Sequence, residues 1–125
     1  MIVLIGPNTY GRKHVDWEIS AALNYKVGDG YAGLFGILLP TFPILPGNSY
    51  EPSGIPARLA ENVSSGYAQV FTWDDACASG DILQMLIENS YSSRSKLEKK
   101  ISNSRPQMQK NTTPKPKTLL GGALY

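Results

Sequence analysis

The feature that most constrains this fold is a change of hydrophobic pattern near the start of the chain. Met1–Ile5 reads MIVLI, a continuous apolar run typical of a strand buried on both faces of a parallel sheet. Gly6 and Pro7 end the run, and a short polar loop follows. Over Lys13–Tyr25 the apolar residues recur at the helical spacing and form one stripe, so this segment is predicted to be an amphipathic helix.

Two later apolar segments continue the alternation. Gly33–Pro40 reads GLFGILLP and Gly66–Trp73 reads GYAQVFTW, so each is predicted to form a strand. The alternation predicts an α/β domain in which helices flank a parallel sheet. Between the two strands, Pro40–Pro56 is rich in proline and glycine, and we expect an irregular loop there. A final helix is expected to reach Ile101, with candidate caps at Asp74, Asp75 and Asp81.

The charge distribution separates a core from a tail. Residues 1–90 carry four basic and nine acidic side chains, whereas residues 91–125 carry eight basic side chains and one acidic side chain. From Ser102 onward the chain is polar and proline-containing without periodicity. We therefore expect a domain over residues 1–101 and a basic, flexible tail over residues 102–125. A basic tail can contact phosphates or an acidic surface, but the sequence has no nucleic-acid motif, so no nucleic-acid partner is predicted.

Other sequence patterns limit which cellular compartment and which kinds of binding site are expected. Cys77 is the only cysteine, which excludes an intrachain disulfide and fits a reducing compartment. The sequence shows neither a signal-peptide pattern nor an apolar run long enough to span a membrane, so a cytoplasmic location without a membrane partner is expected. No residues have metal-ligand spacing, and the Gly6–Gly11 loop lacks the glycine patterns that bind dinucleotides or nucleoside triphosphates, so neither a metal nor a bound cofactor is predicted.

The candidate catalytic residue is Glu18, near the start of the first predicted helix. In parallel α/β sheets, ligands bind beyond the carboxyl ends of the strands, and the loop Gly6–Lys13 lies at such an end. Glu18 falls at the border of the apolar stripe, where partial burial would suit it for acid–base or electrostatic chemistry. The alternative is that Glu18 only complements the helix dipole, as acidic residues in first turns commonly do.

The loop before this helix offers four further polar side chains. Arg12 could meet a phosphate group, and Tyr10 could stack on a ring. Asn8 and Thr9 offer hydrogen-bonding groups at the end of the strand. Each also has a structural explanation, as an exposed loop residue or a turn cap, so the residues alone leave the choice open.

Four segments resemble the TIR-like domain of the Thoeris bacterial antiphage defence system. They read VLIGPNTYGRKHVDWEISAAL from Val3, GLFGILLP from Gly33, IPARLAENVSSGYAQVFTWDD from Ile55 and ISNSRPQMQKN from Ile101. The most specific part is IGPNTYGRKHVDWEI, because order, spacing and residue types all agree. The resemblance runs to about Asn111 and implies the flavodoxin-like fold of the wider TIR-like family.

The resemblance implies a catalytic role for Glu18. TIR domains that break down NAD carry a glutamate on the helix after the third strand, commonly within a W-x-x-x-E pattern, and Glu18 matches that glutamate. His14 occupies the tryptophan position, and Trp17 does not replace it because Trp17 immediately precedes Glu18. The implied reaction is cleavage of the glycosidic bond of NAD, with the carboxylate stabilising positive charge on the ribose. NAD is then a substrate, and the product is ADP-ribose or a cyclised ADP-ribose.

The resemblance also implies partners and a missing part. In Thoeris the cyclic ADP-ribose-type signal activates a separate effector protein, and TIR-type surfaces also support self-association. The family's domain begins with two further βα units before the strand that MIVLI matches. We therefore expect residues 1–101 to be the C-terminal part of the domain, truncated at the N-terminus, with an unpaired apolar strand edge. The alternatives to an enzyme are a non-catalytic interaction or scaffold module and an inactive product of a truncated gene.

Overall fold

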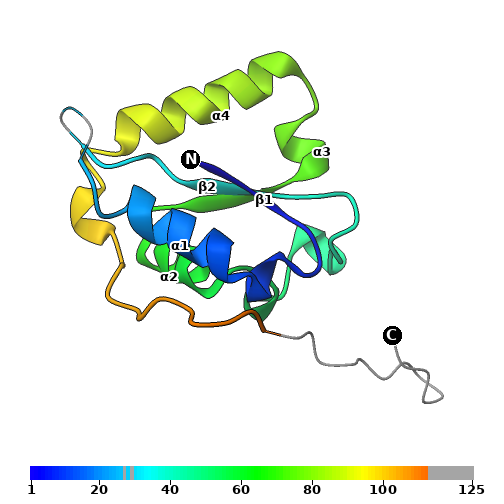
Figure 1. Cartoon of the computed structure of the whole chain (residues 1–125). Helices are drawn as coiled ribbons and strands as arrows, with labels where there is room; N and C mark the ends of the chain where they lie inside the picture. Colours follow the sequence, from blue (N-terminus) through cyan, green and yellow to red (C-terminus); the bar gives the residue numbers. More distant parts are fainter. Residues whose placement is uncertain (27, 29, 113–125) are drawn as a thin grey trace.

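Three parallel strands form the centre of the molecule. The computed structural model describes residues 1–112 other than 27 and 29. The strands lie in the order β1-β2-β3, and both neighbouring pairs are parallel (Figure 1). This confirms the predicted α/β fold with a parallel sheet and flanking helices. The bounds of the strands are β1 Ile2–Ile5, β2 Phe35–Leu38 and β3 Gln69–Thr72.

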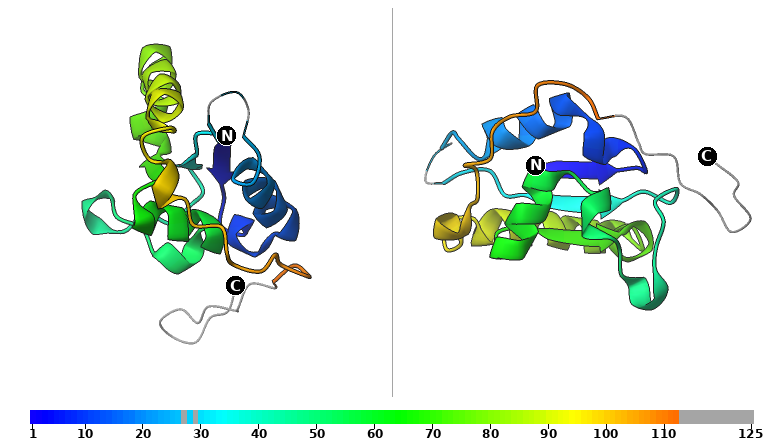
Figure 2. Two further views of the ribbon diagram at one scale, coloured as in Figure 1. Left: turned by 90° about the vertical axis from the view of Figure 1, so that its left-hand side faces the viewer. Right: turned by 90° about the horizontal axis from the view of Figure 1, so that it is seen from below.

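Helices cover the two faces of this sheet. On one face, α1 (Lys13–Ala22) and α2 (Ala57–Ser65) pack over the sheet, and α2 contacts both α1 and β3. On the other face lie the short α3 (Trp73–Ala76) and the longer α4 (Gly80–Ser93). Figure 2 shows α1 on the β1 side of the molecule and α4 on the opposite face of the sheet. Within the described residues, no helix has the length and apolar composition needed to cross a membrane.

Two hydrophobic clusters form the core, one on each face of the sheet. The larger lies under α1 and α2 and contains Ile5, Ile19 and Leu59, all fully buried. The smaller lies under α3 and α4 and contains Phe35 and Ile37 of the middle strand. Gly36 permits close packing over β2, because a Cβ atom there would lie 2.8 Å from Ile5 Cδ1 and 3.0 Å from Leu59 Cδ2. The middle strand is therefore buried on both faces.

The first strand differs from the prediction. The run MIVLI was predicted to be buried on both faces, but in β1 only Val3 and Ile5 are buried, whereas Ile2 and Leu4 are 38% and 53% exposed. The physical reason is position: β1 is an edge strand of the described sheet, and α4 covers β2 and β3 on that face rather than β1. The predicted unpaired apolar edge is confirmed for the described part of the chain.

Several element boundaries also differ. The first helix ends at Ala22 rather than Tyr25, and the last helix is divided into α3 and α4 instead of reaching Ile101. Thr72 and Ser79 cap these two helices, in place of the predicted aspartates. The helix α2 was not predicted at all, because the prolines before it indicated only a loop. In the described part of the chain there are also four short 3-10 turns: η1 Thr9–Gly11, η2 Pro46–Asn48, η3 Pro52–Gly54 and η4 Glu98–Lys100.

Residues 102–112 form an extended segment that crosses α1 and α2, and we name it the strap. Figures 1 and 2 show it following the outer side of these helices. Ser102 at its start is bonded to α2, and Thr112 at its end is bonded to the loop after β1. A flexible tail from Ser102 is therefore wrong for residues 102–112, because buried side chains of both helices bind this segment. The rest of the expected tail, residues 113–125, lies outside the described residues.

Candidate functional site

The loop after β1 carries four of the predicted site residues. It makes a tight turn in which the Gly6 N–H donates to Thr9 Oγ1 over 2.9 Å. This places Thr9 and Tyr10 half-buried in η1, while Asn8 and Arg12 are exposed. The loop thus presents polar side chains at the carboxyl end of β1, as the sequence predicts for a ligand-binding edge.

Glu18 lies on the flank of α1 that points away from α2. Side chains three or four residues apart share a side of a helix, and Glu18 shares its side with Val15 and Ala22. Asp16 and Ser20 occupy the opposite flank, where they contact α2 and the strap. Glu18 is exposed in the described part of the structure, so the partial burial that would suit it for acid–base chemistry is not present there. The reason is that α1 lies over the edge of the described sheet, and its outer flank has no further strand beside it there.

The residue at the expected tryptophan position is part of a small aromatic cluster. His14 and Trp17 lie edge to face, with ring centroids 5.0 Å apart. Lys13 Nζ lies 5.3 Å from the centre of the Trp17 ring. His14 is exposed and lies one turn before Glu18 on α1. An imidazole and a carboxylate therefore share the outer surface of the first two helical turns.

Arg58 on α2 is fully buried and donates five hydrogen bonds. Its Nε and Nη2 donate to the two carboxylate oxygens of Asp16 over 2.9 and 3.3 Å. Its Nη1 donates to Asn103 Oδ1 and to the Arg105 carbonyl, and Nη2 also donates to the Pro106 carbonyl. All five N–H donors of the guanidinium are thus satisfied. One side chain therefore joins α1, α2 and the strap.

Other contacts of the strap involve its main chain. Asn62 on α2 accepts from the Ser102 N–H over 2.9 Å and donates to the Ser102 carbonyl over 2.8 Å. On α1, Asp16 accepts from the Met108 N–H over 2.9 Å, and Trp17 Nε1 donates to the Met108 carbonyl over 2.8 Å. The strap is therefore bound along its length as an extended chain.

One cavity lies between α2 and the strap, near the carboxyl ends of β1 and β2. Its volume is about 630 Å³, within the range of small-molecule sites. Tyr10 lines it from the loop after β1, and Ile55 lines it from the loop after β2. None of the other predicted site residues lines this cavity. The structure therefore separates Tyr10, on the α2 side, from Glu18 on the outer flank of α1.

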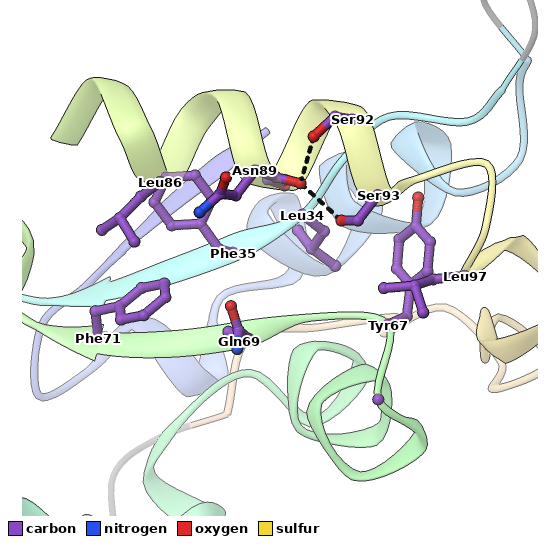
Figure 3. Close-up of a pocket in the computed structure, with 12 residues that line it drawn as sticks. Leu34, Phe35, Tyr67, Gln69, Phe71, Leu86, Asn89, Ser92, Ser93 and Leu97 are labelled. Atoms are coloured by element: carbon purple, nitrogen blue, oxygen red, sulfur yellow. Dashed lines mark hydrogen bonds between the residues drawn. The ribbon is translucent and has the colours of Figure 1, made fainter. Parts of the chain in front are cut away.

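A second cavity of about 390 Å³ lies at the opposite end of the strands, between β3 and α4. Figure 3 shows strand side chains facing those of α4 across it, with Ser92 and Ser93 donating to the Asn89 carbonyl. Tyr67 lines this cavity and donates its hydroxyl to the Ala32 carbonyl over 2.6 Å. Burial raises the pKa of Tyr67 above its usual value. None of the predicted site residues lies here, because the cavity adjoins the amino ends of β2 and β3.

Sequence reasoning assigned no site role to the buried polar residues that organise this region. The relevant residues are Asp16, Arg58 and Asn62, which are all buried. The signal that could have found them is charge pairing: Arg58 is one of only four basic residues in positions 1–90. In the described part of the chain, no group of three or more His, Cys, Asp or Glu side chains could hold a metal ion.

Comparison with known proteins bears on the N-terminal part of the chain. The family model of the Thoeris protein ThsB, TIR-like domain, matches residues 1–41. This range contains β1, the loop after it, α1 with Glu18, and β2. No curated protein and no solved structure matches the chain. Residues 1–41 thus carry the signature of the Thoeris TIR-like domain, which confirms the predicted resemblance over this part of the chain.

Proposed function

We propose that this chain contributes an NAD-processing TIR-like site to bacterial antiphage defence, with Glu18 as its catalytic carboxylate. The observation that carries the proposal is that residues 1–41, which match the Thoeris TIR-like domain, hold Glu18 together with the strand and loop that precede it. The proposed reaction breaks the glycosidic bond between ribose and nicotinamide. Attack by water then gives ADP-ribose, and internal attack gives a cyclic ADP-ribose-type signal.

The chemistry assigned to Glu18 is electrostatic. As nicotinamide leaves, positive charge develops on the ribose, and a fixed carboxylate beside it lowers the energy of the transition state. Such stabilisation is strongest where water is excluded. Glu18 is exposed on the outer flank of α1, so the bound substrate, or another protein segment beside β1, has to provide the water-poor surroundings.

The loop after β1 is assigned to binding of the nucleotide. The exposed guanidinium of Arg12 can pair with a phosphate, and the exposed amide of Asn8 can bind a hydroxyl or a phosphate. The Thr9 hydroxyl accepts from Gly6 and keeps its own proton to donate to a ligand. Tyr10 lines the cavity on the α2 side, so stacking on the same nucleotide requires this ring to turn toward Glu18.

The proposal also assigns a setting and an indirect partner. The reaction takes place in the cytoplasm, and its nucleotide product acts on a separate effector protein. No cofactor is assigned, because the electron pair of the broken bond leaves with nicotinamide and no external oxidant is needed.

The test is NAD turnover by the wild-type chain, Glu18→Gln and Glu88→Gln, with chromatography of nicotinamide and ADP-ribose products. Glu88 is an exposed glutamate on α4 and serves as the matched control. We expect Glu18→Gln to lower kcat by about 100-fold or more at unchanged thermal stability, and Glu88→Gln to match the wild type. Absence of turnover by the wild-type chain would overturn the enzymatic proposal, and full activity of Glu18→Gln would overturn the role of Glu18.

A second candidate function is that of a non-catalytic interaction module. The observation that favours it is the exposed apolar side of β1, where Ile2 and Leu4 are 38% and 53% exposed. Self-association without NAD turnover would support this function over the enzymatic one.

A further inference from the structure

The helix that carries Glu18 is capped by the strap rather than by its own sequence. Arg12 occupies the N-cap position of α1, and its side chain makes no capping hydrogen bond. The first N–H groups of a helix have no partner within the helix. Here the Lys13 N–H donates to Asn111 Oδ1 over 3.0 Å. Asparagine is among the best capping residues, so the strap supplies the acceptor that the local sequence lacks.

The end of the strap also fixes the end of the loop after β1. The Thr112 N–H donates to the Gly11 carbonyl over 2.8 Å. Gly11 is buried, and a Cβ atom there would lie 2.7 Å from the Thr112 carbonyl oxygen. The close approach of the strap therefore requires glycine at position 11, because any side chain there would displace the Thr112 main chain.

The contacts of the rest of the strap determine where Asn111 and Thr112 lie. Asn62 binds its first residue, Ser102, and Arg58 binds two carbonyl groups in its middle. Asp16 and Trp17 then bind both main-chain groups of Met108. Asn111 lies three residues further on, so these contacts with α1 and α2 direct it to the first turn of α1.

We propose that Asn111 and Thr112 are positioning residues for the NAD site. By capping the first turn of α1 and holding Gly11, they set the place of Arg12 at the end of the loop that is assigned to nucleotide binding. The consequence for NAD rests on the proposed function above, whereas the effect on the loop and the helix start does not depend on it.

The experiment compares four full-length chains by hydrogen–deuterium exchange and by NAD kinetics. Asn111→Ala removes the cap, Asn111→Asp keeps an oxygen acceptor at the same place, and Lys110→Ala changes an exposed neighbour. We expect Asn111→Ala to increase exchange of amides 11–15 at least tenfold, with no change in β2 or α2. Asn111→Asp and Lys110→Ala should exchange like the wild type. Exchange at amides 11–15 that does not change, or that rises equally across the sheet, would overturn the proposal.

The kinetic readout separates positioning from a merely structural contact. We expect Asn111→Ala to raise KM for NAD several-fold at similar kcat, and Asn111→Asp to restore it. Unchanged KM and kcat, with the loop amides exchanging faster, would overturn the positioning role. If the wild-type chain does not turn over NAD, the proposed function fails, and the exchange data still decide whether the strap holds the loop.

Gly11→Ala is a second variant that acts from the other side of the contact. The added Cβ atom would meet the Thr112 main chain, so we expect faster exchange at amides 11–15 and also at Thr112. Wild-type exchange at both places would show that the end of the strap does not depend on Gly11 and would count against the proposal.

Discussion

Arg58 joins three segments because a guanidinium can serve several acceptors at once. The guanidinium donates hydrogen bonds to the two carboxylate oxygens of Asp16 and also to carbonyl groups of the strap. A buried charge is tolerated only when it is paired and its hydrogen bonds are made. The contacts around Arg58 meet both conditions, so loss of any one partner leaves a buried charge incompletely satisfied.

Replacement of Arg58 by lysine tests this arrangement. Lysine keeps the charge but has a compact ammonium group in place of the planar guanidinium, and it cannot reach all these acceptors. We expect Arg58→Lys to lower the free energy of unfolding by about 3 kcal/mol, measured by urea denaturation. The control is Arg105→Lys, at an exposed pair whose Nε–Oε1 distance to Glu61 is 2.8 Å, where we expect a loss below about 1 kcal/mol. Equal losses in the two variants would contradict the role given to Arg58.

Individual residues were predictable only as far as local spacing decides their environment. The helical spacing placed Glu18 at the border of the apolar stripe, and its neighbours Val15 and Ala22 are half-buried. Whether Glu18 itself is covered depends on what lies beyond β1, which local spacing does not contain. The cap of α1 was not predictable for the same reason, because Asn111 is 98 residues away from Lys13 in the sequence.

At the scale of elements, apolar runs predicted the three strands of the described sheet, whereas α2 was not predicted. Its buried positions are Arg58, Leu59 and Asn62, so two of the three residues on the buried side are polar. A search for an apolar stripe fails on such a helix, because its buried face is satisfied by hydrogen bonds rather than by hydrophobic contacts alone. Pro56 immediately before the helix was interpreted as part of the loop, although proline is common at helix starts.

The connection between α2 and β3 gives a prediction about pH. Tyr67 joins this connection to the segment before β2 through its hydrogen bond to Ala32, and burial raises the pKa of Tyr67 above 10.0. The folded state therefore holds this proton more tightly than the unfolded state. Its contribution to stability is complete below pH 10 and is lost as pH rises through the folded pKa.

We therefore expect the free energy of unfolding to fall above pH 10, and to fall less steeply in Tyr67→Phe. At pH 7 the same variant should lose about 1 kcal/mol with the hydrogen bond to Ala32. Denaturation curves between pH 8 and 11 measure both effects. Burial raises the pKa of Tyr50 as well, so Tyr50→Phe serves as a comparison that keeps the Tyr67 contribution. Identical slopes for the wild type and Tyr67→Phe would show that Tyr67 does not control the alkaline loss.

At the scale of the whole molecule, the edge strand β1 of the described sheet has the apolar sequence of an interior strand. The Met1 carbonyl accepts from the Phe35 N–H, and the Ile5 carbonyl accepts from the Leu39 N–H. Main-chain groups alternate in direction along a strand, so those of Ile2 and Leu4 point away from β2. Their side chains are also exposed. The sequence predicted a parallel sheet with an unpaired apolar edge, but only the strand order identified which side of β1 is open.

This edge predicts self-association of the chain. Exposed apolar edge strands pair with other chains, and a charged side chain on the edge opposes such pairing. We expect the wild-type chain to form larger species as its concentration rises in sedimentation velocity. Leu4→Lys should weaken this association at least tenfold at little cost in stability, because Leu4 is already 53% exposed. Met85→Lys is the control, since Met85 lies on α4 and is 49% exposed. A monomer at every concentration, or equal effects of the two lysines, would show that β1 is not the associating surface.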